Sequence, residues 1–241
     1  MNRSFLYGMK NKLIIFFLLF CSSADAQTGS WNIINTKLDL NDRWNLFGEA
    51  QLRSLRFYQD FHYYELKAGG SFSISKTFSL TTGFGIFDTY SPGGNFKSPQ
   101  VNDEFRTWLQ LNMSQYERRL KFEHRYRAEQ RWTSDGFRNR FRYRFSSVYP
   151  INSKKIEPGT FYLNISDELF FTNRAPYFER NRFFVGAGHE FSESFSLQLG
   201  FMSQFDYRIN DETGRNFIQL SFLFELDAKK KPGEKVPAAM D

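Results

Sequence analysis

Apolar and polar residues alternate along most of this chain, and the alternation is clearest between residues 119 and 132. Successive side chains of a β-strand point to opposite faces, so this pattern predicts an extended strand with one apolar and one charged face. A helix would scatter the same charges around its axis. The apolar face holds Leu120, Phe122, His124, Tyr126, Ala128 and Trp132. The charged face holds Arg119, Lys121, Glu123, Arg125, Arg127, Glu129 and Arg131.

The same alternation recurs in the rest of the chain. Segment 137–149 places Phe141, Tyr143 and Phe145 opposite a run of arginines. Counting 29–40 as a strand gives about eleven strands, whereas single-chain bacterial barrels have even numbers. We therefore expect ten strands, if 29–40 is not a full strand, or twelve, if one is hidden. The predicted fold is all-β, an antiparallel transmembrane β-barrel of about ten to twelve strands with up-and-down topology. Weaker alternation is found in 44–53, 65–74, 104–113, 195–206 and 218–226.

The N-terminal residues have the features of an export signal. Lys10 and Lys12 precede an apolar stretch over 13–20, and Ala24-Asp25-Ala26 has the form of a cleavage site. The stretch is too short to span a bilayer. The expected organisation is a signal peptide over 1–26, an outer-membrane barrel over 27–228 and a disordered C-terminal tail over 229–241.

Composition fits strands whose two faces meet different solvents. Aromatic residues make up 19% of the chain and charged residues 24%. In a membrane barrel the apolar face looks outward to lipid, whereas in a soluble periplasmic β-protein it forms the core. Strands of about 12–14 residues exceed the usual length in soluble sheets and favour the membrane. Aromatic residues near strand ends could form an interfacial girdle. They are Trp31, Trp44, Tyr90, Trp132, Tyr149 and Tyr207.

Connections are expected to differ between the two ends of the barrel. Short turns near 41–42, 75–76, 115–117 and 192–193 alternate with longer links. Short periplasmic turns and long outer loops are usual in such barrels. The link 151–159 is a longer exception on the turn side. The longer links run through 57–61, 91–102, 133–136, 172–178 and 209–214.

One arginine-rich hairpin carries a family resemblance. The stretch from His124 to Arg131, followed by Arg138 to Arg144, resembles the paired hairpin of exported bacterial barrels catalogued as domain-of-unknown-function family 2490. The resemblance extends over roughly residues 29–226. It implies a location in the bacterial outer membrane and supplies no activity. One departure is that Leu226 is followed by a tail, whereas many outer-membrane barrels end on an aromatic residue used for assembly.

The candidate functional feature is an arginine ladder. On neighbouring antiparallel strands these side chains share one face, and like charges opposite each other need counter-charges or an anionic ligand. One interpretation is a lumen track that guides small anionic solutes. The other is a non-conducting structural barrel whose interior is filled by ion pairs. The ladder consists of Arg119, Arg125, Arg127, Arg131, Arg138, Arg140, Arg142 and Arg144. Candidate lumen counter-charges are Glu49, Glu65, Glu104, Glu123 and Glu129, with Glu168 and Glu190 at similar parity.

Other chemistry has weaker support in the sequence. His62, with Asp60 nearby, is the candidate base for a lipid-modifying enzyme, but no serine motif accompanies it. His124 and His189 share the lipid-facing parity. We expect no enzyme activity and no cofactor. We also expect no metal site, because no residues have metal-ligand spacing. The expected partners are outer-membrane lipids and small anionic solutes. Nucleic acid is not expected, because without residues 1–26 the net charge falls from +6 to about +4 and an exported protein rarely meets nucleic acid.

Overall fold

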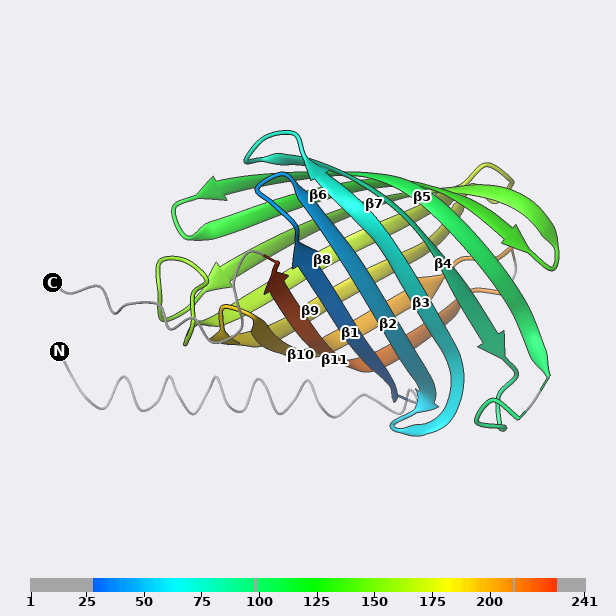
Figure 1. The fold of residues 1–241 in the computed structure, drawn as a ribbon. Coiled ribbons are helices and arrows are strands. Elements are labelled where there is room, and N and C mark those ends of the chain that lie inside the picture. Colours follow the sequence, from blue (N-terminus) through cyan, green and yellow to red (C-terminus); the bar gives the residue numbers. More distant parts are fainter. Residues whose placement is uncertain (1–27, 98, 210, 229–241) are drawn as a thin grey trace, which may run out of the picture.

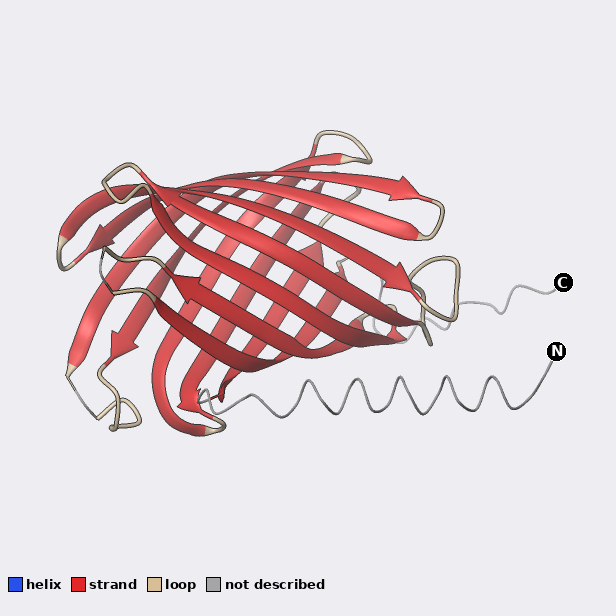
Figure 2. Cartoon of the chain, turned by 180° about the vertical axis from the view of Figure 1, so that it is seen from behind, coloured by secondary structure: helices blue, strands red, loops and turns tan. Residues whose placement is uncertain are grey.

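The computed structural model describes residues 28–97, 99–209 and 211–228. The expected signal peptide (1–26) and disordered tail (229–241) lie outside the described residues. Within them every element of regular structure is a β-strand (Figure 2). No helix in the described ranges is long and apolar enough to cross a bilayer.

Eleven strands close into one barrel (Figure 1). Each strand pairs with its neighbours in the sequence, and β1 pairs with β11 to complete the ring. The predicted all-β barrel is thus confirmed. The strands are β1 (Thr28–Asp39), β2 (Trp44–Arg56), β3 (Gln59–Ser73), β4 (Phe78–Tyr90), β5 (Gln100–Glu117), β6 (Leu120–Thr133), β7 (Gly136–Pro150), β8 (Phe161–Thr172), β9 (Phe178–Ser192), β10 (Phe195–Asp206) and β11 (Thr213–Asp227).

The closing pair corrects our expectation of an even strand number. Strand direction alternates along the chain, so the first and last of eleven strands run the same way. β1 and β11 accordingly pair in parallel, from Thr28 opposite Asn216 to Asp39 opposite Asp227. All other neighbouring strands are antiparallel. A parallel ladder is only slightly less stable per residue, so an odd barrel can close.

The connections differ less between the two ends than the sequence indicated. We call the end where β1 begins the loop end, and the other the turn end. At the loop end, β2 and β3 are joined only by Phe57 and Tyr58, and β6 and β7 only by Ser134 and Asp135. The longer loop-end links lie between β4 and β5, β8 and β9, and β10 and β11. The link between β7 and β8 is long at the turn end, as expected.

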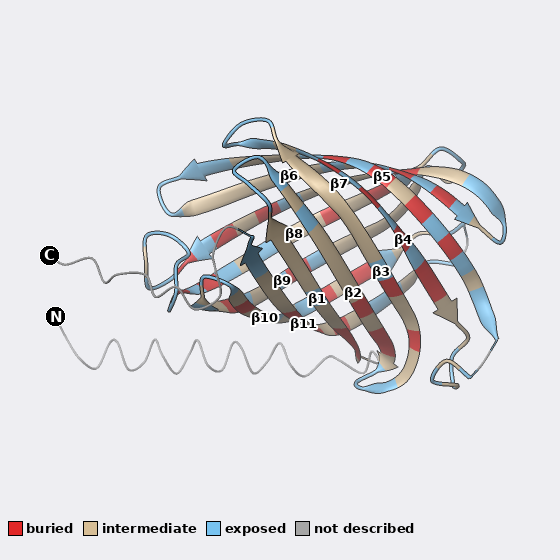
Figure 3. Cartoon of the chain, in the orientation of Figure 1, coloured by how far each residue is buried: buried red, intermediate tan, exposed pale blue. Residues whose placement is uncertain are grey.

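The barrel is polar inside and apolar outside, and Figure 3 shows the alternation of burial along the strands. Leu109 on the outer face of β5 is 55% exposed, whereas Glu104 on the inner face of the same strand is 1% exposed. This confirms the predicted two-faced strands. Exposed apolar side chains of the outer face include Ile34, Leu46, Leu66, Phe84, Ile86, Phe105, Leu109, Phe141, Leu163, Ile165, Phe183, Val185 and Leu199. Buried polar side chains include Gln51, Glu65, Thr81, Arg106, Gln110, Glu129, Arg131, Arg140, Glu168, Gln198, Gln204 and Gln219.

A small aromatic cluster interrupts the polar interior. Trp31, Phe184, Met202 and Phe217 pack together as buried side chains from β1, β9, β10 and β11. Trp31 therefore does not belong to an outer girdle, as we expected from its position near a strand end. Its indole N–H donates to Gln51 at 2.8 Å, which satisfies the polar atom of this buried ring.

Glycines on the inner face make room for the Phe184 ring. A Cβ at Gly200 would lie 2.5 Å from two atoms of that ring and 2.6 Å from the carbonyl oxygen of Val185. A Cβ at Gly48 of β2 would meet nothing within 4 Å. Inside the barrel, the Phe184 ring therefore packs directly against the backbone of β9 and β10.

This packing leads to a stability prediction. We expect Gly200→Ala to lower the free energy of unfolding by about 1–3 kcal/mol, because overpacking forces side chains and backbone to shift. Gly48→Ala should change it by no more than about 0.5 kcal/mol. Denaturant unfolding followed by far-UV circular dichroism measures both. Equal effects of the two substitutions would contradict the packing argument.

Candidate functional site

One cavity of about 1440 Å³ occupies the interior of the barrel. All eleven strands contribute side chains to its lining, which extends from Lys37 and Ser73 near the turn end to Arg138 and Tyr207 near the loop end. Basic side chains outnumber acidic ones along this lining. The cavity is therefore a long electropositive space, and it is the candidate functional site.

The arginine ladder lies in this cavity, with one exception. Three arginine pairs stand directly opposite each other on β6 and β7, while Arg140 stands opposite Glu129. Arg119 lies in the turn between β5 and β6 and is exposed, because β6 begins only at Leu120. The turn thus removes it from the ladder. The three pairs are Arg125 with Arg144, Arg127 with Arg142, and Arg131 with Arg138.

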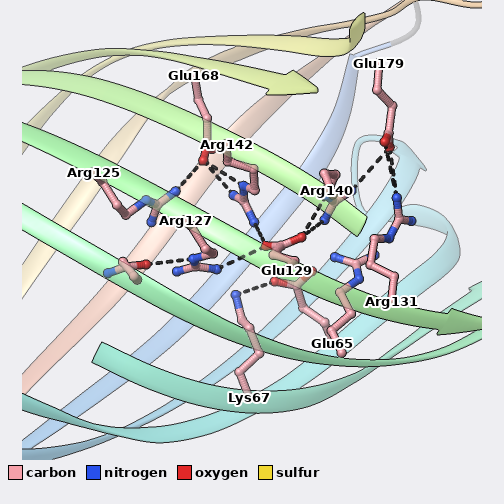
Figure 4. Close-up of polar contacts among 12 residues, drawn as sticks. Glu65, Lys67, Arg125, Arg127, Glu129, Arg131, Arg140, Arg142, Glu168 and Glu179 are labelled. Carbon is pink, nitrogen blue, oxygen red and sulfur yellow. Dashed lines mark hydrogen bonds and ion pairs between the residues drawn. The ribbon is translucent and has the colours of Figure 1, made fainter. Parts of the chain in front are cut away.

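Glu129 is the centre of the ladder (Figure 4). Its side chain is almost fully buried and pairs with Arg140 at 2.6 Å, Arg142 at 2.7 Å and Arg127 at 3.6 Å. Removing charges from water is expensive unless they are paired and hydrogen-bonded. One carboxylate shared by three guanidinium groups is the arrangement that allows this row of arginines to be buried.

Further carboxylates extend the network around the wall formed by β5 to β9. Glu168 pairs with Arg125 at 2.5 Å and Arg142 at 2.8 Å. Glu179 links β9 to Arg131 of β6 and Arg140 of β7, at 3.2 and 3.3 Å. Glu104 pairs with Arg131 and with Arg106 of its own strand. The network therefore ties together strands that are not neighbours in the sheet.

A second, smaller network lies on β2 and β3. Lys67 pairs with both Glu49 and Glu65, and Arg53 pairs with Glu65 at 3.2 Å. Of the remaining expected counter-charges, Glu123 pairs with Lys121 at 2.9 Å near the turn end. Glu190 does not line the cavity.

Arginine–aromatic stacking joins the two networks, and sequence reasoning missed it. The guanidinium of Arg53 lies 3.5 Å from the Trp31 ring centroid, and that of Arg182 lies 4.9 Å from the same ring. Arg182 also lies 4.9 Å from the ring of Phe170, which Arg142 covers from 4.5 Å. A layer of stacked groups thus crosses the interior from β2 to β8. The inward position of Phe170 is hidden in the sequence by apolar neighbours on both sides.

Some arginines of the cavity are not neutralised. Among the described residues, Arg138, Arg144 and Arg182 have no carboxylate within ion-pair distance. The Nε atoms of Arg125, Arg138 and Arg144 are buried and have no hydrogen-bond partner in the described part of the chain. Buried donors without acceptors are uncommon, so these positions call for an acceptor from solvent or from a ligand.

The three histidines have different surroundings. A β-bulge opposite Arg53 and Ser54 turns His62 inward, where it is 6% exposed and lines the cavity. The Asp60 carboxylate instead accepts a hydrogen bond from the Gly93 amide. His124 bonds to Tyr143 at 2.9 Å, and His189 packs against Phe161. The described residues include no group of His, Cys, Asp and Glu placed to hold a metal ion.

Comparison with known proteins gives one match. No curated protein and no solved structure matches the chain. The model of the family described as "Protein of unknown function (DUF2490)" matches residues 28–215, which include β1 to β10 and the arginine-rich hairpin. This confirms the resemblance that the hairpin carries in the sequence. The chain therefore belongs to the DUF2490 family.

Proposed function

We propose that this protein is an outer-membrane β-barrel of a Gram-negative bacterium that lets small anionic solutes pass through its arginine-lined interior. The apolar outer face supports the membrane location, because a soluble protein rarely exposes such a large apolar surface. Strands of 12 to 18 residues are long enough for tilted spans. The export signal expected at residues 1–26 is consistent with this location.

The observation that carries the passage of anions is the excess of unpaired arginines in a long cavity. Arg138 and Arg182 lie in the loop-end halves of β7 and β9, and Arg144 lies just past the middle of β7 toward the turn end. Rings or rows of fixed positive charge lower the energy of an anion in a pore and exclude cations. Several weak sites in sequence also let an ion leave as readily as it enters.

The alternative is a non-conducting structural barrel with an ion-paired interior. The network around Glu129 and the stacked layer of Arg53, Trp31, Arg182 and Phe170 favour it, because they fill the middle of the barrel. Small barrels are often filled by their own side chains. The two functions differ in whether ions cross.

Conductance measurements in planar bilayers distinguish a channel for anions from a non-conducting structural barrel. We expect the refolded protein to give stable steps with a reversal potential in a KCl gradient that indicates anion selectivity. Arg138→Gln and Arg182→Gln should shift this potential toward zero, because each removes a cavity charge without breaking an ion pair. Arg119→Gln, which removes an exposed turn charge, should leave it unchanged. A folded, inserted protein that never conducts would overturn the proposal in favour of the structural barrel.

A further inference from the structure

The arginine pairs of the β6–β7 hairpin differ in how far their charge is compensated. Arg127 and Arg142 share Glu129, and Arg131 has Glu104 and Glu179. In the pair nearest the turn end, Arg125 reaches Glu168, while Arg144 has no ion-pair partner among the described residues. Like charges directly opposite on a sheet repel. The Arg125–Arg144 pair is therefore the least compensated position of the hairpin.

The unsatisfied donors lie at the same place. Arg125 and Arg144 both have a buried Nε atom without a hydrogen-bond partner in the described residues, whereas in the Arg131–Arg138 pair only Arg138 does. A guanidinium presents five N–H donors in a rigid fork that matches the oxygens of carboxylate and phosphate groups. Arg125 and Arg144 stand directly opposite each other on adjacent strands, so both guanidinium groups can donate to one oxyanion.

The strand register adds a second unpaired charge near this pair. Arg144 of β7 stands opposite Glu168 of β8, and Glu168 stands opposite Arg182 of β9. Glu168 forms its ion pairs with Arg125 and Arg142, whereas Arg144 and Arg182 lie outside ion-pair distance of it. Four arginines thus surround the single carboxylate of Glu168, so the local charge is positive and favours an anion with more than one negative charge.

Arg125 and Arg144 both line the cavity. Toward the turn end, the cavity lining beside this pair carries hydroxyl and amide side chains from β5, β7 and β8: Asn112, Ser114, Ser146, Asn164 and Ser166. The nearest carboxylate on that side, Glu123, is paired with Lys121. The pair therefore lies at the boundary between the ion-pair network and a part of the cavity lined by neutral polar side chains.

We propose that Arg125 and Arg144 form a binding site for a divalent oxyanion of the phosphate class. This inference rests on the proposed function, because it names the solute class that the anion-conducting interior prefers. The site holds the oxyanion through charge-assisted hydrogen bonds from both guanidinium groups, which are about twice as strong as neutral ones. Chloride, with one charge and no fixed geometry, fits the two forks less well.

Calorimetric titration with inorganic phosphate tests the site independently of conduction. The refolded full-length protein is kept in a detergent without phosphate groups, so that free phosphate is the only source of this chemistry. We expect Arg144→Gln to weaken phosphate binding about tenfold or more, because it removes hydrogen bonds to a charged ligand. Arg119→Gln, which removes an exposed arginine of the β5–β6 turn, should change the affinity by less than about threefold.

The outcomes separate the two proposals. Absence of phosphate binding by the folded protein, or unchanged binding after Arg144→Gln, would overturn the site even if the barrel conducts anions. Phosphate binding that depends on Arg144 in a protein that never conducts would keep the site and overturn the passage of solutes. In a conducting protein, we expect phosphate to reduce chloride conductance in the wild type and not in Arg144→Gln.

Discussion

Replacing Glu129 by glutamine is expected to lower the free energy of unfolding by about 3–5 kcal/mol, because it leaves buried positive charges without their partner. Arg127, Arg140 and Arg142 converge on this carboxylate. Arg140 keeps Glu179 and Arg142 keeps Glu168 after the change, but Arg127 keeps no carboxylate, only the amide oxygen of Gln110 and the Trp108 ring. The variant should therefore still fold, with a free energy of unfolding lowered by this amount.

A matched substitution distinguishes the effect of losing a buried carboxylate from the effect of losing a negative charge. Glu123→Gln removes the same charge from the same face of the same strand, but Glu123 is more exposed and has a single partner, Lys121. We expect it to cost about 1 kcal/mol or less. Urea unfolding in one detergent or lipid composition, followed by tryptophan fluorescence, compares the two variants. Similar effects of Glu129→Gln and Glu123→Gln would show that the central ion pairs do not stabilise the barrel.

A double variant tests whether the arginines are the cause. In Glu129→Gln with Arg140→Gln, the carboxylate and the arginine opposite it are both neutral amides. We expect the double variant to be more stable than the sum of the two single effects indicates, since groups in one ion-pair network are coupled by about 0.5–3 kcal/mol. Strict additivity would mean that the Glu129–Arg140 contact carries no stabilising free energy.

The sequence predicted those features that follow from alternation within one strand or one hairpin. The faces of β6 and β7 and the inward position of Glu104, Glu129 and Glu65 follow from the period of two. Hairpin pairing then places the arginines of β6 opposite those of β7. Arg119 was misplaced because alternation continues through it, while the chain there is already a turn.

Features that depend on contacts between distant strands could not be read from the pattern. The parallel closure of β1 with β11 has no local signal, so the count of strands remained open. The inward aromatic residues Trp31, Phe184 and Phe217 contradict a purely polar interior, and they are buried because glycines and stacked arginines surround them. The bulge that turns His62 inward breaks the period of two at one residue, which a parity argument cannot detect.

Leu109→Arg is expected to destabilise the protein by about 2–4 kcal/mol in a lipid bilayer, because an arginine on the lipid-facing side of a barrel must stay near the hydrocarbon midplane. Leu109 lies in the middle of β5 on the outer face and is 55% exposed. At an exposed site in water, the same substitution changes stability by no more than about 0.5 kcal/mol. The size of the effect therefore reports the solvent around the outer face.

Position along the strand provides the control. Gln115, also exposed, lies near the turn end of β5, where a charge can reach the interface. Denaturant unfolding of both variants in lipid vesicles measures their free energies of unfolding. We expect Gln115→Arg to lower this free energy by only about 0–1 kcal/mol, because the penalty falls with distance from the midplane. A barrel that folds in vesicles and tolerates Leu109→Arg as well as Gln115→Arg would not be surrounded by hydrocarbon at β5. Its apolar outer face would then have to be covered by protein, and the proposal of a lipid-embedded channel would fail.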